Sequence, residues 1–288
     1  MPKRHVAPPE PHAITLALGG GGARGLAHIV MLETLDELGL KPARIVGTSM
    51  GAVVGAAYAS GVAGTDLRRY ALDRLRDRAR VMALVLQARV GRITDILRFA
   101  ANPVLLDGEK VLDLFWPETV PDLFEDLGIP FAALATDYHA RDEAVFDTGS
   151  LVTGVAASMA IPGLIKPVTA MGRVFIDGGV VNPLPFDHLR GSDGIRIAVD
   201  VSGGTVDDEQ KTPDPFAAMI GAAQIMQGAI VAQKLKSRAP DVLVRPAVGG
   251  HHVLDFFHAK EIFAAAEACR DTMKRDIAAA IESVSAGR

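Results

Sequence analysis

The chain has 288 residues, of which 49% are hydrophobic and 22% charged, and its formal net charge at pH 7 is −4. This composition supplies a sizeable apolar core and lacks the basic excess of nucleic-acid-binding proteins, so we expect no nucleic-acid partner. Cys269 is the only cysteine. It excludes an internal disulfide and a multi-cysteine metal site, and it fits a reducing compartment, so we expect a cytoplasmic protein.

The N-terminal residues 1–12 combine two basic residues with several prolines and have no apolar stretch behind them. They are interpreted as a flexible lead-in rather than a signal peptide, with a single domain over residues 13–288. Three uncharged runs, 45–65, 148–165 and 215–233, approach membrane-spanning length. Because they are rich in Gly, Ala, Ser or Gln, we expect them to form buried helices of a soluble core.

Strand and helix patterns alternate along the chain. An apolar strand at 13–18 precedes a helix at 26–38, and a second strand at 43–46 precedes a small-residue helix at 52–60. Residues 66–108 have a helical pattern. Further strands are expected at 131–136, 144–147, 174–176, 195–201 and 242–245, and further helices at 215–236 and 260–284. This order predicts an α/β fold with three layers (α/β/α) and a mostly parallel central sheet.

The second strand runs into Gly47-Thr48-Ser49-Met50-Gly51, which matches G-x-S-x-G. A strand that delivers a serine into a tight turn, with a helix starting directly after it, is the setting of a nucleophilic serine. Gly47 and Gly51 leave room for the chain to reverse direction. We therefore predict that Ser49 is a nucleophile at a helix N-terminus.

The first strand ends in a glycine loop, Gly19 to Gly22, followed by Ala23, Arg24 and Gly25. Consecutive glycines expose backbone N–H groups that can hold an anion. One candidate anion is the oxyanion of an acyl-transfer intermediate, and the other is a pyrophosphate, because Gly20, Gly22 and Gly25 also satisfy G-x-G-x-x-G. A dinucleotide site further needs an acidic residue after the second strand, where Ser49 stands instead, so the oxyanion role is favoured.

A nucleophilic serine needs a base. Asp177 lies at the end of an apolar strand before Gly178 and Gly179, at the sheet edge where α/β folds gather their chemistry. Burial beside an acyl site would raise its pKa and make it a better base. The alternative is a triad of Ser49, an acid such as Asp200 or Asp241, and His251 or His252. The single βα unit before Ser49 counts against that alternative, because α/β-hydrolases place several strands before the nucleophile.

Four segments together resemble the patatin-like phospholipases, specifically the bacterial members related to the catalytic domain of neuropathy target esterase. They are LALGGGGARGLAHI, IVGTSMGAVVGA, ASMAIPGLIKPV and FIDGGVVNPLP, and the resemblance covers about 14–202. It implies cleavage of carboxylic esters of lipids by a Ser49–Asp177 dyad, as a phospholipase A, lysophospholipase or esterase. It also implies no metal or other cofactor, and an oxyanion loop formed by Gly20, Gly21, Gly22 and Arg24, with Gly25, Gly178 and Gly179 completing the motifs.

A lipid substrate needs an apolar path to the serine. Residues 81–86 and 93–106 carry Leu, Ile, Val and Phe with spaced arginines, so this region is a candidate lid, and core packing remains the alternative interpretation. We expect a lipid or acyl-ester substrate and transient peripheral contact with a membrane surface.

Overall fold

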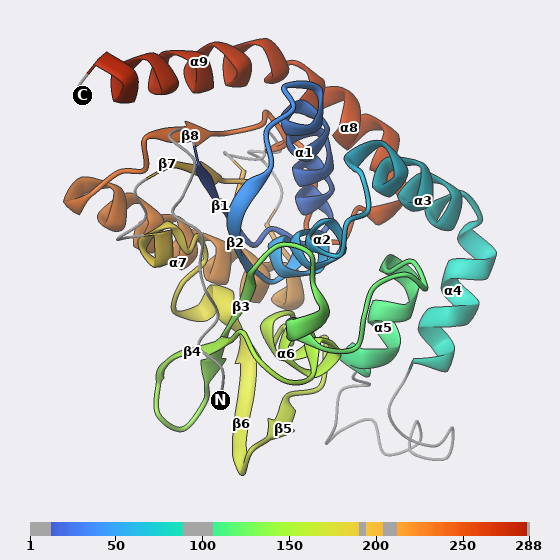
Figure 1. The fold of residues 1–288 in the computed structure, drawn as a ribbon. Coiled ribbons are helices and arrows are strands. Elements are labelled where there is room, and N and C mark those ends of the chain that lie inside the picture. The colour runs from blue at the N-terminus through green and yellow to red at the C-terminus, as the bar shows by residue number, and fades with distance from the viewer. Residues whose placement is uncertain (1–12, 89–105, 190–193, 204–211, 287–288) are drawn as a thin grey trace, which may run out of the picture.

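The computed structural model describes residues 13–88, 106–189, 194–203 and 212–286. A mixed sheet of eight strands lies at the centre of this part of the chain, in the order β5-β6-β3-β2-β1-β7-β8 with β4 also paired to β3 (Figure 1). The strands are β1 Ile14–Leu18, β2 Pro42–Thr48, β3 Phe131–Asp137, β4 Asp142–Phe146, β5 Val168–Ala170, β6 Arg173–Asp177, β7 Ile195–Val199 and β8 Val242–Val244.

Five of these strands, β1, β2, β3, β7 and β8, run parallel to one another. Both β4 and β6 pair with β3 in the antiparallel orientation, and β5 pairs antiparallel with β6. The predicted three-layer α/β fold with a mostly parallel sheet is therefore confirmed. The division into a lead-in and one domain over 13–288 stays a prediction.

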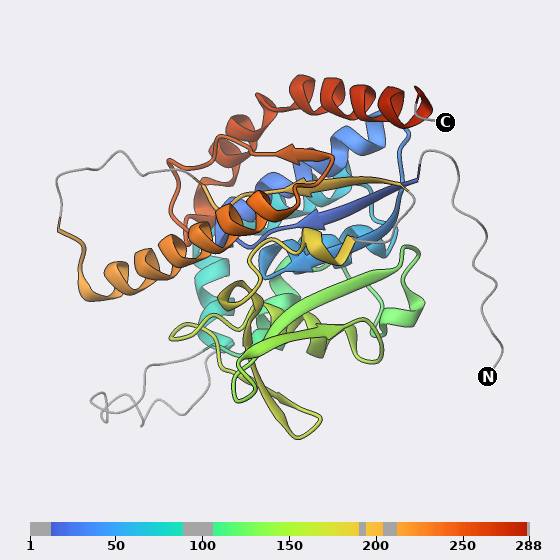
Figure 2. The same cartoon turned by 90° about the vertical axis from the view of Figure 1, so that its left-hand side faces the viewer.

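Helices cover both faces of the sheet (Figures 1 and 2). Their bounds are α1 Ala27–Glu37, α2 Met50–Ala59, α3 Gly64–Arg76, α4 Arg78–Gln87, α5 Gly108–Phe115, α6 Leu151–Ser158, α7 Pro215–Ser237, α8 Ala259–Glu267 and α9 Arg270–Ala286. Short 3-10 turns η1 (Gly22–Leu26), η4 (Gly178–Val180) and η5 (Phe186–Leu189) follow strands β1 and β6.

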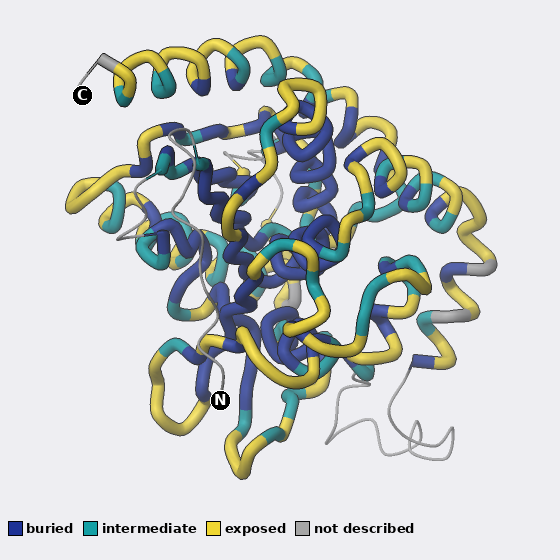
Figure 3. The backbone as a smooth tube through the Cα atoms, viewed as in Figure 1, coloured by how far each residue is buried: buried dark blue, intermediate teal, exposed yellow. Residues whose placement is uncertain are grey.

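The strand residues alternate between two apolar cores, as the two-residue period of a strand dictates. On one face Leu16, Leu18 and Ile45 join a large cluster with the helices α1, α2, α3, α5, α6, α8 and α9. On the other face the smaller Ala17 and Val46 meet η5 and the second half of α7, through residues such as Val231. Figure 3 shows β1 and most of α1 buried, whereas the hairpin of β5 and β6 is largely exposed at its tip.

Two of the three uncharged runs are buried as expected, since 45–65 forms the buried end of β2 and the buried helix α2, and 148–165 contains α6. The prediction was wrong for 215–233. Large side chains in the first half of α7, among them Ile225 and Met226, are exposed, because only the second half of this helix lies over the sheet. In the described ranges, none of the helices combines the length and the apolarity needed to cross a bilayer.

The helical region predicted at 66–108 contains α3 and α4, its residues 89–105 lie outside the described residues, and α5 begins only at its last residue. The helix predicted at 260–284 divides at Ala268 and Cys269 into α8 and α9. Ion pairs around the buried carboxylate of Glu33 on α1 join these two C-terminal helices to the N-terminal helices α1 and α3. Glu33 pairs with Arg68 on α3 and Arg270 on α9, and Arg68 also pairs with Glu267 on α8.

Candidate active site

The turn between β2 and α2 presents Ser49. Its backbone has φ 54° and ψ −123°, a strained conformation for a residue with a side chain. The glycines on either side are required by close approach rather than by their own dihedral angles. A Cβ at Gly47 would lie 2.6 Å from Gly51 O, and one at Gly51 would lie 2.2 Å from Leu18 O. The turn is therefore packed directly against the end of β1.

The hydroxyl of Ser49 donates a hydrogen bond of 2.7 Å to Oδ2 of Asp177, and both residues are almost fully buried. The second oxygen, Oδ1, accepts a 2.7 Å bond from the amide of Gly179. The backbone of Asp177 is held as well, since its amide donates to Ala160 O and its carbonyl accepts from the Thr136 hydroxyl. Both carboxylate oxygens thus have fixed partners.

Asp177 reaches the serine by an unexpected route. The prediction placed it at the carboxyl end of a strand on the same edge as Ser49, which is the arrangement of parallel strands. Instead β6 runs antiparallel to β3, with Asp177 beside Ala135. Because Thr48 pairs with Leu134, one residue earlier on β3, the registers bring Ser49 and Asp177 to the same level.

Burial raises the pKa of Asp177 to about 6, and the hydrogen bonds from Ser49 and Gly179 offset part of that rise. A carboxylic acid with this pKa is mostly ionised at neutral pH. It is also a stronger base than an exposed aspartate, whose pKa is near 3.9.

Ser158, at the C-terminal end of α6, is a site residue that the sequence did not single out. Its hydroxyl accepts a 2.9 Å bond from the amide of Ser49 and donates a 2.6 Å bond to Leu134 O. It has no exposed surface. Ser158 therefore ties the strained serine turn to β3. It lies inside the segment ASMAIPG, whose resemblance to the family was noted without a role for any single residue.

The glycine loop lies beside the serine, as expected. A Cβ at Gly20 would come within 3.3 Å of Ser49 Cβ. The amide of Gly20 is already used, because it donates to Pro183 O at 2.9 Å. The amides of Gly21 and Gly22, in contrast, have no hydrogen-bond partner within the described ranges. Among the described residues they are therefore unused donors, and Gly22 lines the same cavity as Ser49.

The buried side chain of Arg24 lies against the loop after β7. A Cβ at Gly203 would collide with its Nη1, which places the guanidinium beside the loop after β7. Burial lowers the pKa of Arg24, although the charge of Asp200 acts against this, and its Nε has no partner among the described residues. The guanidinium is thus part of the support behind the loop.

His28 on α1 contacts the glycine loop, and apart from its closeness to the loop no pattern in the sequence pointed to this role. Its Nε2 lies 2.8 Å from Gly19 O, and the ring is fully buried. Burial lowers its pKa to about 4, so the ring is neutral at physiological pH and donates to that carbonyl.

The members of the alternative triad are engaged elsewhere. Asp241 binds Arg196, and Asp200 binds Arg245 and Ser202. His251 and His252 lie in the loop that precedes α8. Within the described ranges, the acceptor of the Ser49 hydroxyl is Asp177.

An apolar cavity of about 190 Å³ opens beside Ser49. Its wall includes Gly22 from the glycine loop and residues of α4, α5, the loop after α6, and the loop before α8. The apolar lining residues include Val81, Met82, Val85, Val111, Phe115, Met159, Ile161, Leu164, Leu254 and Phe257. Part of the candidate lid, 81–86, therefore forms cavity wall, whereas most of 93–106 lies outside the described residues.

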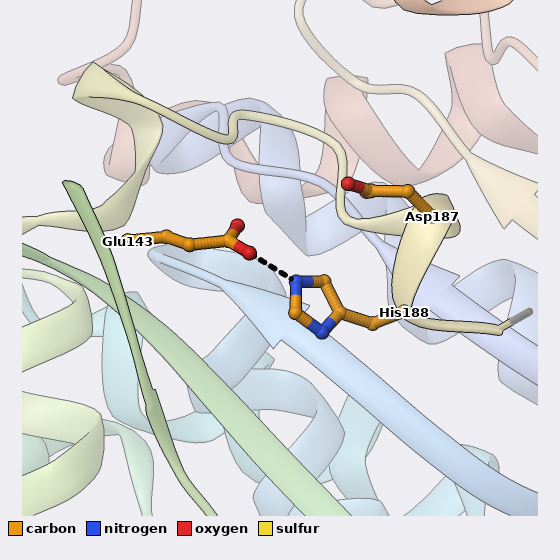
Figure 4. A group of neighbouring side chains, drawn as sticks. All are labelled: Glu143, Asp187 and His188. Atoms are coloured by element: carbon orange, nitrogen blue, oxygen red, sulfur yellow. Dashed lines mark hydrogen bonds and ion pairs between the residues drawn. The ribbon is translucent and has the colours of Figure 1, made fainter.

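Glu143, Asp187 and His188 form the one group of potential metal ligands found within the described ranges (Figure 4). His188 Nε2 lies 2.9 Å from Glu143, and Asp187 binds Lys234 of α7. Burial acts to raise the pKa of Asp187, but Lys234 and Asn182 together outweigh burial and lower it. Because Lys234 already supplies the positive charge, the group is an ion-pair network that fixes α7 to the loop after β6.

Fold and site together define an α/β protein in which a serine–aspartate pair lies at the side of an apolar cavity, next to free loop amides. The chain belongs to the patatin-like phospholipase family, whose model matches residues 16–190. The resemblance stated from the motifs is thereby confirmed.

Two relatives are similar in sequence to about two thirds of this chain. The chain is 38% identical over 191 residues to an "Uncharacterized NTE family protein" of Mycobacterium bovis, covering 66% of this chain and 49% of that one. It is 36% identical over 198 residues to "Lysophospholipase NTE1" of Cryptococcus neoformans, covering 68% of this chain and 11% of that one. The chain thus spans about half of the first relative and a small part of the second.

Among solved structures, VipD from Legionella pneumophila matches with a TM-score of 0.44 at 15% identity, over 92% of this chain and 67% of that one.

Proposed function

We propose that this protein hydrolyses carboxylic esters of lipids, with Ser49 as nucleophile and Asp177 as its base. The observation that carries the proposal is the 2.7 Å hydrogen bond from the Ser49 hydroxyl to the Asp177 carboxylate beside an apolar cavity. Membership of the patatin-like phospholipase family supports the same chemistry, and the name of the fungal relative points to lysophospholipids.

The reaction follows from the contacts. Asp177 Oδ2 accepts the Ser49 proton while Oγ attacks the ester carbonyl, and the pair of electrons of the C=O double bond moves onto oxygen. The amides of Gly21 and Gly22, which have no other partner among the described residues, donate to this oxyanion. Collapse of the tetrahedral intermediate breaks the ester C–O bond, and the proton on Asp177 passes to the departing alcohol.

A water molecule then attacks the acyl-serine. Asp177 accepts its proton, a second tetrahedral intermediate forms, and its collapse returns the proton to Ser49 and releases the fatty acid. Every proton transfer uses one carboxyl group, whose pKa of about 6 suits both directions near neutral pH. The chemistry calls for no cofactor.

The cavity indicates the substrate class. Its lining is almost entirely aliphatic and aromatic, with Arg74 the one charged side chain among the described residues of its wall. An apolar acyl chain fits this lining, and the headgroup would remain outside. The proposal includes contact between the protein and the lipid surface that presents this acyl chain.

The test is release of fatty acid from lysophosphatidylcholine by the wild-type protein and by Ser49→Ala. We expect hydrolysis by the wild type, rising steeply above the micellar threshold of the substrate, and hydrolysis at the background rate for Ser49→Ala. Equal turnover by both proteins would remove Ser49 from the mechanism, and no turnover of lysophospholipids or simple acyl esters would reject the function.

Ser158→Ala is expected to lower kcat by about 10- to 100-fold with little change in KM. Loss of the hydroxyl leaves the buried amide of Ser49 without an acceptor, and an unsatisfied buried group costs about 1–3 kcal/mol. The strained turn is then free to relax and misplace Oγ. Steady-state kinetics on a soluble acyl ester measure the effect.

Two comparisons separate positioning from general damage. Ser150→Ala removes the exposed hydroxyl that caps the other end of α6 and should leave kcat within about twofold of wild type. An unchanged kcat in Ser158→Ala, or a loss explained wholly by unfolding in a thermal melt, would contradict the positioning role.

A further inference from the structure

The first half of α7 is an apolar surface in contact with water. Residues 215–233 contain no charged side chain, and a helix that is apolar on all sides is normally buried. Yet Ile225 is 76% exposed, Met226 60% and Met219 48%. Several large apolar side chains exposed on one helix indicate an interaction surface.

The topology places this surface at the edge of the sheet that carries the site. Since α7 connects the parallel strands β7 and β8, its first residues lie at the carboxyl edge and its last residues at the opposite edge. Figure 2 shows the first half of α7 extending past the sheet, whereas Val231 and Leu235 further along the helix pack on it.

Residues of α7 contact segments that lie next to the cavity. A Cβ at Gly163 would lie 3.2 Å from Met219, and its neighbours Ile161 and Leu164 line the cavity. Further along, a Cβ at Gly179, two residues after Asp177, would lie 2.7 Å from Gln227. Thus α7 lies alongside both the cavity wall and the turn η4 that follows Asp177.

Exposed apolar side chains from other segments lie around the same site. Met82 of α4 and Leu254 of the loop before α8 are part of the cavity wall, and Val180 follows Gly179. With the three residues of α7 they form what we term the apolar rim: Met82, Val180, Met219, Ile225, Met226 and Leu254. Met82 and Leu254 belong to the cavity wall itself, and Met219 lies beside Gly163 next to that wall.

We propose that the apolar rim, led by α7, docks on the surface of a phospholipid bilayer or micelle and places the cavity against it. This inference rests on the proposed function, because a lipid esterase must receive an acyl chain directly from a lipid phase. The absence of charge over 215–233 favours shallow apolar insertion into zwitterionic lipid over attraction to anionic headgroups.

Sedimentation with sucrose-loaded phosphatidylcholine vesicles tests the docking on a Ser49→Ala background, where no lipid is consumed. We expect Ile225→Gln/Met226→Gln to lower the partition coefficient at least tenfold. A matched control, Leu38→Gln/Leu123→Gln, replaces two exposed leucines at the opposite edge of the sheet and should stay within twofold of its parent. Binding of the parent should change little between low and high salt.

Each outcome decides one question. Absence of binding by the parent, or equal loss in the α7 and control variants, overturns the docking surface. If light scattering shows a dimer that Ile225→Gln/Met226→Gln converts to a monomer, α7 binds a second copy and the lipid surface is rejected. Hydrolysis of a soluble short-chain ester, with Ser49 restored, should be equal in both variants; its absence rejects the proposed function and leaves the vesicle result valid.

Discussion

Asp177→Asn is expected to lower kcat by about 10³-fold, within the range of a lost general base. Asparagine has nearly the same shape and keeps an acceptor for the Gly179 amide, but it cannot take the proton of Ser49. Initial rates on a soluble acyl ester measure the loss. The matched control, His251→Ala/His252→Ala, should stay within about threefold of wild type. Loss with the histidine pair and activity in Asp177→Asn would instead restore the triad.

The same residue sets the pH dependence of the reaction. Because the base must be ionised, kcat/KM should rise with pH through a midpoint of about 6 and then level off. Any residual activity of Asp177→Asn should lack this inflection. A midpoint near 4 in the wild type would contradict a buried, functional Asp177.

The raised pKa of Asp177 also makes the stability of the fold depend on pH. A group whose folded pKa lies above its unfolded value of 3.8 contributes stability that is complete below about 3.8 and is lost as pH rises through about 6. At pH 8 the free energy of unfolding of Asp177→Asn should therefore exceed that of wild type by up to about 3 kcal/mol. Chemical denaturation measures this difference. That difference should shrink toward pH 4.

Gly22→Ala is the second change with a large expected effect, a loss of about 10²- to 10³-fold in kcat. Gly22 has φ +56°, and a Cβ there would lie 2.2 Å from Val253 O, so the loop must move. Moving it would displace the amides of Gly21 and Gly22 from the position proposed for the oxyanion. The measurement is kcat on a soluble ester.

Gly250→Ala is the matched control, because Gly250 lies close to Val253 in the chain and a Cβ there meets nothing within 4 Å. It should retain wild-type kcat. A Gly22→Ala protein that melts like wild type and keeps its kcat would exclude the loop from the oxyanion site.

Much of the site could be predicted because its residues stand in local patterns. The glycine loop, the serine turn and the Asp-Gly-Gly segment each follow an apolar strand, and a strand followed by a helix places such turns at one edge. The pairing of Ser49 with Asp177 required more, since β6 is antiparallel and only the register with β3 sets the level of Asp177. Register depends on long-range packing, which no short pattern reveals.

Ser158 was missed for a related reason. Its hydroxyl meets the Ser49 amide across 109 positions of sequence, and a serine at the end of a small-residue helix carries no local signal for that bond. The exposure of α7 was mispredicted because its composition is that of a core helix. Only the length of the sheet decides how much of that helix is covered, and the sheet ends before the helix does.

The proposed reaction requires that Ser49 attacks an acyl ester and that Asp177 accepts its proton. The most direct measurement is the site of covalent labelling by a fluorophosphonate, read by peptide mass spectrometry in wild type, Asp177→Asn and His251→Ala/His252→Ala. We predict the adduct on Ser49 in the wild type and the histidine variant, and strongly slowed labelling in Asp177→Asn. An adduct on another residue, or labelling that needs the histidines and ignores Asp177, would contradict the account.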